Sequence, residues 1–426
     1  MKHSTRSRRV RQRPRTGKIQ RHQNQPMLWP EGERPVIHNR QVRLQVQQRG
    51  EITPYGGLAL AHDLAMRLGI DRDINASMQL LRLYLPYFDS DHLLTHVYNQ
   101  YVGGLCIEDI ANLQHSDAVK HLTGACRIPD PSTAGDFLRR FNRSNLRAFQ
   151  QVIDRAREKV WRQMPNSRKA VATIDMDSTI KEIYGQCKEG ADFSYTGKWS
   201  YHPLLLTLAE THELLRTLNR PGNATSADGA AEALKAQQRG YKSLSTIEQW
   251  AAEFNYTLSS GLEEFGLIGS TFRVVVKRQL IETRQGQQLL YTDYVYRFII
   301  TNIPRSEMDA GEVLCFAYGR CDQENIIEQA KNGIAALRMP TGELLANAAF
   351  LMAGQLAWCL RAWLSLLALP RETTRWEWKW FRQAFVYVAA RITWGARQAK
   401  VYLVGGHRFV EHLITASRRL QCFTFT

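Results

Sequence analysis

The spacing of apolar residues changes character at Lys169, and this change constrains the fold more than any other feature of the chain. Between residues 58 and 162, apolar side chains recur at the intervals that line one face of a helix. From Ala170 to Asp177, a short apolar and β-branched run ends in acids, which is typical of a buried strand. The sequence therefore predicts a mixed α/β fold in which a helical region precedes a sheet.

Two further strands and a helix follow this strand in the prediction. Residues 193–208 and 213–218 are expected to form strands, with a polar turn at 210–212 between the two segments. A helix capped near Ser226 then runs to Ala236. The predicted order is strand, strand, strand, helix.

The remainder of the chain predicts a hairpin followed by helices. Residues 271–281 and 289–303 are alternating or β-branched runs separated by a turn. After Pro304 the pattern is helical to nearly the end of the chain. The apolar run 344–369 is interrupted by polar side chains before it reaches the length of a membrane span, so we expect a buried helix.

Positive charge is concentrated at the two ends of the chain. Residues 1–25 carry nine Lys or Arg and no acid, and residues 371–426 carry ten Lys or Arg and three acids. These ends therefore hold +9 and +7, which together equal the whole net charge of +16. A polyanionic partner is expected, and residues 1–50 are interpreted as a basic flexible arm. The predicted DNA contacts in this arm are Arg8, Arg9 and Arg11.

The seven cysteines are scattered singly, without the paired spacing of a zinc site. The basic N-terminal segment is not followed by an apolar stretch, so it does not resemble a signal peptide. We expect reduced thiols, a cytoplasmic, nucleoid-associated location and no membrane partner.

One candidate DNA-facing helix covers residues 134–141, with Ser132 or Thr133 as its N-cap and Arg139 and Arg140 on the helix. An ordinary solvated helix explains the same pattern.

A second candidate is the run 375–382, in which tryptophans alternate with cations that include Lys379 and Arg382. A helix whose tryptophans pack inward and whose cations face solvent explains this run equally.

Asp175 and Asp177 are predicted to share one face of the strand that begins near residue 170, because side chains alternate between the faces of a strand. Carboxylates at the edge of a sheet are well placed to hold a divalent metal. The alternative is that Asp177 only caps the turn at Ser178 and Thr179.

A second group of charged residues follows the predicted hairpin. Arg320, Glu324, Glu328 and Lys331 fall along one helical stripe. Taken alone, this pattern also fits a solvent-exposed helix face with weak salt bridges.

The second group resembles the signature around the final catalytic Glu of the DDE transposases of bacterial insertion sequences. Arg320, Glu324 and Lys331 match its spacing, and Tyr318 takes the place of its tyrosine. The chain is also similar to the group called insertion-sequence family thirteen-eighty, which carries the DDE domain of group one. The segments that resemble this group, in order, are 174–179, 185–190, 201–205, 220–223, 226–229 and 322–333.

The resemblance implies a ribonuclease-H-like core in which strand acids and a helix Glu bind two Mg²⁺ (or Mn²⁺) ions. Asp177 would be the first-strand ligand and Glu324 the helix ligand, while Asp175 would bind metal or support a ligand. Hard oxygen donors suit Mg²⁺, and two such ions can activate a nucleophile and neutralise a leaving oxygen.

The second catalytic Asp is not identified. The family continues past the helix of 226–236 into another strand that ends in Asp, whereas this chain passes at Arg239 into a segment that resembles a region well downstream. A core strand is therefore predicted to be missing. Two weak candidates remain: Asp228, which is expected to cap a helix, and Asp293, which lies in the second β-run.

Four parts are predicted: a basic arm (1–50), a helical DNA-binding domain (51–165), a ribonuclease-H-like core with a β-hairpin insertion (166–338) and a basic helical C-terminal region (339–426). The implied function is a transposase that binds the inverted repeats of its element and target DNA as a homo-oligomer. The alternatives are a decayed transposase that only binds DNA and a metal-dependent nuclease unrelated to mobile elements.

Overall fold

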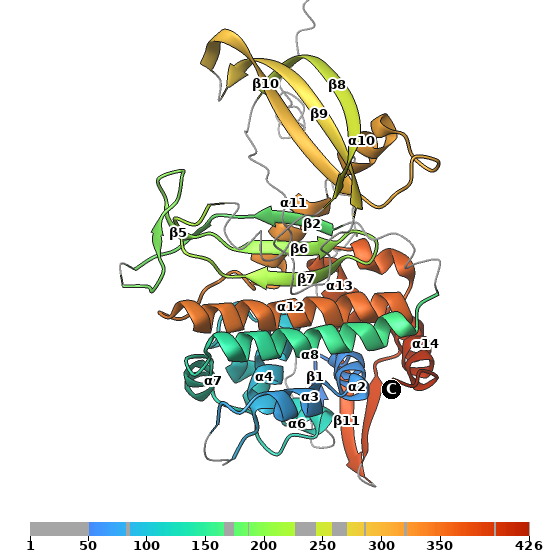
Figure 1. Cartoon of the computed structure of the whole chain (residues 1–426). Helices are drawn as coiled ribbons and strands as arrows, with labels where there is room; N and C mark the ends of the chain where they lie inside the picture. The colour runs from blue at the N-terminus through green and yellow to red at the C-terminus, as the bar shows by residue number, and fades with distance from the viewer. Residues whose placement is uncertain are drawn as a thin grey trace, which may run out of the picture. The chain divides into compact units, whose positions relative to one another are not determined.

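The apolar run near the C-terminus forms α12 (Leu344–Leu367), the central helix of the fold (Figure 1). Residues 346–365 are all buried. By length and composition α12 could cross a membrane, but 89% of its most apolar window is buried inside the fold. The prediction of a buried helix is confirmed.

The computed structural model describes residues 51–81, 86–165, 174–185, 187–225, 244–257, 271–284, 287–318, 322–395 and 398–425. Gly50–Thr426 is one compact unit with a mixture of helices and small sheets. The arm residues Arg8, Arg9 and Arg11 lie outside the described residues.

The region 58–162 is helical, as predicted. Its helices are α2 (Leu58–Leu68), α3 (Ile70–Ser77), α4 (Asp89–Val102), α5 (Ile110–Gln114), α6 (Asp117–Thr123), α7 (Pro131–Leu138) and α8 (Arg143–Arg162). The buried side chains of α8 recur at helical spacing and include Phe149, Val152, Ile153, Ala156 and Val160. This stripe and α12 belong to one hydrophobic core, which extends from Leu58 to Leu420.

The cap of α7 differs from the prediction. Asp130 is the N-cap and accepts the backbone N–H of Thr133 at 3.0 Å, while the hydroxyls of Ser132 and Thr133 donate to the same carboxylate. An ionised carboxylate accepts several hydrogen bonds at once, so Asp130 is a better acceptor here than either hydroxyl. The helix ends at Leu138, and Arg139 is its C-cap residue.

The first described sheet contains β2 (Ile174–Ser178), β6 (Leu204–Leu208) and β7 (Glu213–Leu218), in that order and antiparallel. It confirms that strands follow Lys169 and that a turn separates 204–208 from 213–218. The rest of the predicted strand 193–208 is divided, because β4 (Asp192–Phe193) and β5 (Trp199–Tyr201) pair with β3 (Lys181–Glu182) in a separate small sheet. The helix predicted from Ser226 lies outside the described residues.

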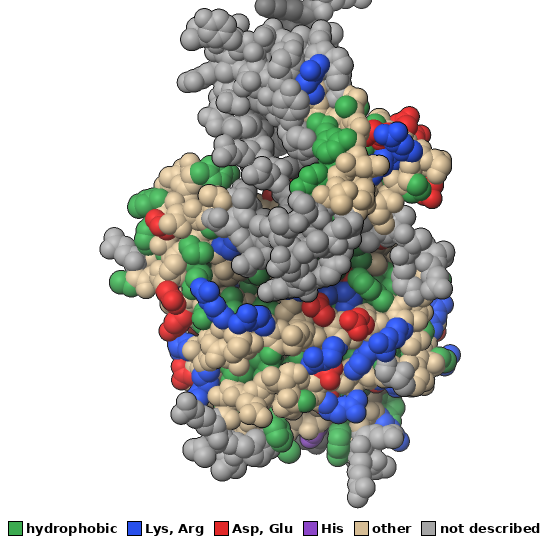
Figure 2. Space-filling model, in the orientation of Figure 1, with side chains coloured by type: hydrophobic (Ala, Val, Ile, Leu, Met, Phe, Trp, Pro, Cys, Tyr) green, Lys and Arg blue, Asp and Glu red, His purple; other side chains and the backbone are tan. Residues whose placement is uncertain are grey.

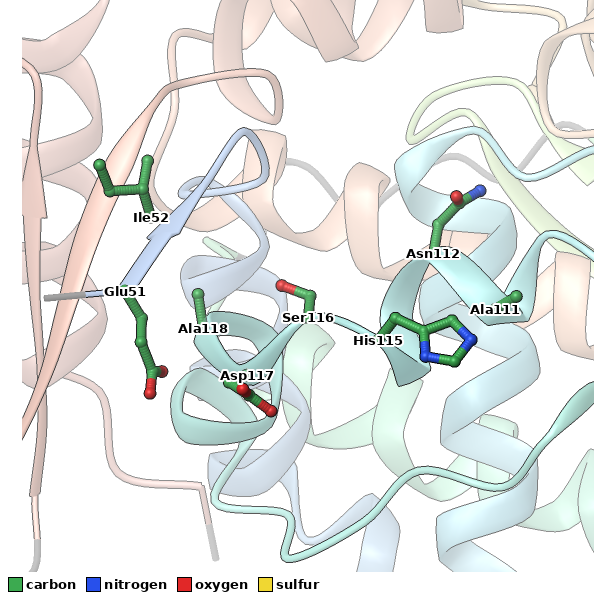
Figure 3. A pocket seen from close by; sticks show the side chains of 8 residues that line it. All are labelled: Glu51, Ile52, Ala111, Asn112, His115, Ser116, Asp117 and Ala118. Atoms are coloured by element: carbon green, nitrogen blue, oxygen red, sulfur yellow. The ribbon is translucent and has the colours of Figure 1, made fainter. Parts of the chain in front are cut away.

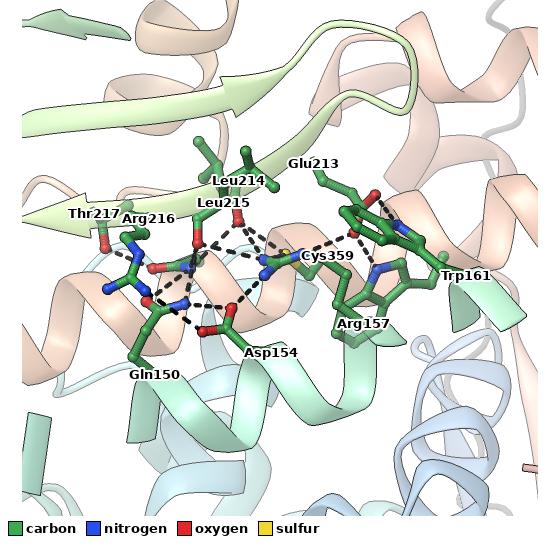
Figure 4. Close-up of polar contacts among 12 residues, drawn as sticks. Gln150, Asp154, Arg157, Trp161, Glu213, Leu214, Leu215, Arg216, Thr217 and Cys359 are labelled. Carbon is green, nitrogen blue, oxygen red and sulfur yellow. Dashed lines mark hydrogen bonds and ion pairs between the residues drawn. The ribbon is translucent and has the colours of Figure 1, made fainter. Parts of the chain in front are cut away.

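A buried polar network fixes β7 on α8 and α12 (Figure 4). Glu213, at the start of β7, accepts the indole N–H groups of Trp161 and Trp363 at 2.9 and 2.7 Å and pairs with Arg157 at 3.2 Å. On α12, the Gln355 amide donates to the carbonyl of Leu215 at 2.8 Å. Because buried polar groups need hydrogen-bond partners, this network favours one position of β7 relative to α8 and α12.

The predicted hairpin is confirmed as β9 (Thr271–Arg284) and β10 (Gln287–Thr301), which pair antiparallel. A third long strand, β8 (Leu244–Thr257), pairs with the other edge of β9 and was not predicted. Helix α10 (Ala310–Tyr318) packs on this sheet, with Val313 and Leu314 against Val275.

The C-terminal region is not helical throughout, contrary to the prediction. After α11 (Asp322–Glu328), the π-helix η3 (Gln329–Gly333), α12, the short 3₁₀ helix η4 (Arg371–Arg375) and α13 (Trp378–Phe385), the chain forms strands β11 (Ala390–Gly395) and β12 (Gln398–Leu403) before α14 (Val410–Gln421). Strand β11 also pairs with β1 (Glu51–Thr53). Ile392 is buried and Val401 packs partly buried on the core, so alternate side chains of this hairpin cover the helices.

Candidate catalytic residues and DNA-contact surfaces

Strand β2 holds Asp175 and Asp177 two positions apart, opposite Thr207 and Leu205 of β6. Asp175 is 8% exposed, whereas the side chain of Asp177 is exposed at the end of the strand. The carboxylate of Asp177 accepts the backbone N–H of Ser178 at 2.8 Å. This bond is the turn-capping contact that the alternative interpretation expects, although a carboxylate can accept several hydrogen bonds at once.

Glu324 lies on the solvent side of α11, because Glu324 and Glu328 are exposed while Ile326 and Ile327 are buried. Glu328 accepts a hydrogen bond from the Asn332 amide at 2.6 Å. The predicted stripe is not a continuous α-helical face. Residue 320 and the side chain of Tyr318 lie outside the described residues, and Lys331 belongs to η3.

The π-helix η3 is clamped by α13 and α4. The carboxamide oxygen of Gln329 accepts the backbone N–H of Trp378 at 3.0 Å. The Arg382 guanidinium donates to the carbonyls of Gly333, Tyr101 and Gln100 at 2.6, 2.9 and 2.7 Å. Single-turn π-helices interrupt the α-helical register and are frequent at functional sites. The clamp fixes the register of the segment that follows Glu324.

Two buried cations lie at this clamp, Arg361 of α12 and Arg382 of α13. Neither forms an ion pair with a carboxylate of the described residues. The guanidinium carbons of Arg382 and Arg361 lie 4.9 and 5.0 Å from the ring centre of Trp378, where the ring face stabilises positive charge. Burial lowers the pKa of Arg361 to about 9 and that of Arg382 to about 10. Arg382 is 7% exposed and its nitrogens are occupied by interior carbonyls, so we assign it a packing role and withdraw it as a candidate DNA contact.

The charge of Lys181, close after β2 in the chain, interacts with that of Lys331 in η3. The pKa of Lys181 is lowered by burial and by the positive charges of Arg338 and Lys331.

Within the described part of the chain, no three His, Cys, Asp or Glu side chains are grouped as metal ligands. The oxygen donors of Asp175, Asp177 and Glu324 are the type that Mg²⁺ prefers. Asp228 lies outside the described residues, and Asp293 is in β10, opposite Ile281 of β9. Strand β10 belongs to a different sheet from β2, so Asp293 does not extend the β2 sheet.

Exposed cations gather on α8 and the turn before it. Arg139 and Arg140 are exposed after α7, and Arg139 pairs with Asp136 and, at 3.5 Å, with Glu343. Arg143, the first residue of α8, and Arg147, about one turn further along that helix, are also exposed. Figure 2 shows Lys and Arg side chains over the α8 region of this face, with a few acids among them. The cations of α8 were not predicted as contacts, although their four-residue spacing was a readable signal.

Helix α13 follows neither interpretation of the run 375–382 throughout, because one tryptophan and one cation are buried while another of each is exposed. Trp378 is fully buried, whereas Lys379 and Trp380 face outward and Trp380 is 59% exposed. Lys379 therefore remains accessible as a candidate DNA contact.

A shallow surface pocket lies where β1 meets α5 and α6 (Figure 3). Its lining residues include Glu51, His115 and Asp117. The hydroxyl oxygen of Ser116, also in the lining, accepts the backbone N–H of Val119 at 3.3 Å as the N-cap of α6. The lining residues thus belong mainly to the N-cap of α6 and to the neighbouring strand β1, and they have structural roles there.

Comparison with known proteins gives one family. The family model described as Transposase DDE domain group 1 matches residues 34–246 and 234–424. The two matches overlap at 234–246, the stretch in which the sequence passes from the 226–236 segment to the segment that begins at Arg239. No curated protein matches the chain significantly.

Proposed function

Because the chain belongs to the transposase DDE domain group 1 family, we propose that it is the transposase of a bacterial insertion sequence. In this proposal it binds the terminal inverted repeats of its element in the cytoplasm and catalyses metal-dependent cleavage and transfer of DNA strands. The observation that carries the proposal is the extent of the family match, which runs from residue 34 to residue 424.

The catalytic core is proposed to be ribonuclease-H-like. Three features support this assignment: β2, β6 and β7 are antiparallel neighbours in chain order, two acids lie on the first of these strands, and Glu324 lies on a later helix. The β8–β9–β10 sheet then corresponds to an insertion between the third strand and that helix.

Asp177 and Glu324 are the proposed ligands of a divalent ion, Mg²⁺ or Mn²⁺, and Asp175 is a further ligand or a support for Asp177. An ion bound by these carboxylates would lower the pKa of an attacking water or 3′-hydroxyl and neutralise the leaving oxygen. Because Mg²⁺ ligands lie at about 2.1 Å, Asp177 and Glu324 must approach within ~8 Å of each other to share such a site. Arg320, Lys331 and Tyr318 are proposed to support the helix ligand and the scissile phosphate.

DNA binding is proposed to use the basic arm (Arg8, Arg9 and Arg11), the cations Arg139 and Arg140, and Lys379. Phosphate contacts from such side chains position a protein on duplex DNA without reading its sequence. A homo-oligomer would hold both ends of the element together.

A second candidate function is a decayed transposase that binds DNA without cleaving it. It is favoured by one observation: among the described residues, β2 pairs with β6 on one side and with no strand on the other. Two-ion catalysis needs ligands on both sides of the scissile phosphate. If the second acid is lost, one ion is held weakly and cleavage is poor.

Mobility shift and strand cleavage on the inverted repeats of the element distinguish these functions. The wild type is compared with Glu324→Ala in Mg²⁺ and in Mn²⁺, and Glu328→Ala is the matched control because it removes another exposed carboxylate from the same helix. Cleavage abolished only by Glu324→Ala supports the active transposase. Equal inactivity of all three proteins with unchanged DNA shifts supports the decayed form. Loss of DNA binding by the wild type would refute both.

A further inference from the structure

Strands β1, β11 and β12 form a sheet with two unlike faces, which we call the ribbon sheet. The inner face carries Ala390 and Ile392, which are buried against the core, and α6 packs against both β11 and β12. The outer face carries the alternate residues, because neighbours along a strand point to opposite faces. Figure 1 shows β11 extending beyond the neighbouring helices.

The outer face of the ribbon sheet is exposed and cationic. Arg391 lies directly opposite Tyr402, and Thr393 lies directly opposite Lys400. Arg391 and Lys400 are exposed, Tyr402 is 48% exposed, and Ile52 of β1, opposite Arg391, is 57% exposed. The Arg391 guanidinium carbon is 5.1 Å from the Tyr402 ring centre, which holds this cation against the sheet.

The charge of this surface is not balanced locally. The sequence has three Lys or Arg and no Asp or Glu between residues 390 and 403, the stretch that contains β11 and β12. The one acid of β1, Glu51, points to the inner side and pairs with His121 of α6 at 2.5 Å. Within the described residues, neither Arg391 nor Lys400 has a carboxylate within ion-pair distance.

Lys400 lies on β12, an edge strand of this sheet, where a cation also discourages strands from pairing between molecules. That role alone does not require the tyrosine, the isoleucine and the two cations to share one accessible face. An acid-free face of this kind is complementary to a polyanion. The sequence adds a second argument, because the stretch that precedes β1 along the chain has nine cations in its first 25 positions.

We propose that the outer face of the ribbon sheet binds the sugar–phosphate backbone of duplex DNA, with Arg391 and Lys400 as the phosphate contacts and Tyr402 as the support of Arg391. The proposal rests on the proposed function, since it assigns a further DNA-binding surface to the same protein. Phosphate contacts fix the position of the duplex and carry no sequence information.

The test compares the full-length wild type with Arg391→Gln/Lys400→Gln on two duplexes, one from the element end and one of unrelated sequence. Each lost phosphate contact should reduce the slope of log affinity against log salt by about 0.9, so the double variant should bind about 1.8 less steeply. The loss of affinity should be similar on both duplexes, as expected for backbone contacts. Thermal unfolding checks that the variant is folded.

The matched control is Lys198→Gln/Arg305→Gln, which removes the same charge from exposed cations that pair with Glu182 and Glu253. It should leave the slope unchanged. If the wild type binds DNA and the ribbon double variant keeps the wild-type slope, the ribbon proposal fails while the proposed function stands. A changed sedimentation coefficient with an unchanged slope would overturn it in favour of a contact between copies of the chain. If the wild type binds neither duplex, both proposals fail.

Discussion

The buried network around Glu213 predicts that substituting this residue lowers the free energy of unfolding much more than substituting an exposed glutamate. Glu213 is fully buried, and its two carboxylate oxygens accept from Trp161, Trp363 and Arg157. In Glu213→Gln one of these oxygens becomes an NH₂ group, which then faces a donor in either orientation of the amide. The substitution preserves the volume of the side chain while it removes charge and an acceptor.

The expected loss follows from the partners. Breaking one partner of a buried ion pair costs roughly 3–5 kcal/mol, because the remaining charge is uncompensated. Arg157 keeps the carbonyl of Leu214 at 3.0 Å and a contact with Asp154, so its charge is only partly uncompensated. We therefore expect Glu213→Gln to lower the free energy of unfolding by about 3 kcal/mol, at the lower end of that range.

Urea denaturation of the wild type, Glu213→Gln and Glu182→Gln measures this loss. Glu182 pairs with Lys198 at 3.2 Å and both side chains are about half exposed, so the control should cost less than about 1 kcal/mol. A cycle with Arg157→Met should show that the two interior substitutions are less than additive, because they disrupt the same interaction. Equal losses for Glu213→Gln and Glu182→Gln, or full additivity with Arg157→Met, would refute the assignment of this network as the anchor of β7.

Three other predictions follow from described or sequence features. Burial lowers the pKa of His92 and of His96 to about 4, well below the unfolded value of 6.5, so the folded protein holds both neutral. Stability should be full above pH 6.5 and should fall by about 1.4 kcal/mol per pH unit per histidine between pH 6.5 and 4; urea midpoints across this range should change less steeply in His96→Gln, and an unchanged pH slope would contradict the assignment. Asp130→Ala should cost about 1 kcal/mol in the same assay because α7 loses its N-cap, and a neutral effect would remove the cap as a stabilising feature. Deleting residues 1–25 should flatten the salt dependence of DNA binding, whereas an unchanged slope would show that the arm makes no phosphate contacts.

The spacing of apolar residues correctly predicted those helices and strands whose buried faces determine that spacing. Helix α12 was recognisable from an apolar run with isolated polar residues, β6 and β7 from apolar runs on either side of a polar turn, and the β9–β10 pair from alternating or β-branched runs. Strand β8 was missed because its two alanines and its glutamates favour other structures. Its conformation depends on pairing with β9 over its whole length, which overrides local propensity.

The sequence predicted which residues are candidates for the site, but it predicted their burial and hydrogen-bond partners only in part. Strand alternation placed Asp175 and Asp177 together, but their unequal exposure depends on where β2 ends and how β6 covers it. The sequence of α13 shows a cation among aromatics at Arg382. Only the fold brings the carbonyls of Gly333, Tyr101 and Gln100 to its guanidinium. Carbonyl groups that are distant in the sequence cannot be identified as acceptors from the spacing of residues around Arg382.

The sheet topology restricts which strands can carry the second catalytic acid. A second strand acid close to Asp177 would be expected on a strand beside β2, since carboxylates must converge to share an ion. The next described strand after β7 is β8, and it pairs with β9. Asp293 lies in that same β8–β9–β10 sheet. Asp175 already shares β2 with Asp177, so if the wild type cleaves DNA, Asp175→Asn should reduce cleavage far more than Asp293→Asn at equal DNA affinity. The reverse result would mean that the β10 sheet supplies the ligand and that β2 does not define the metal site.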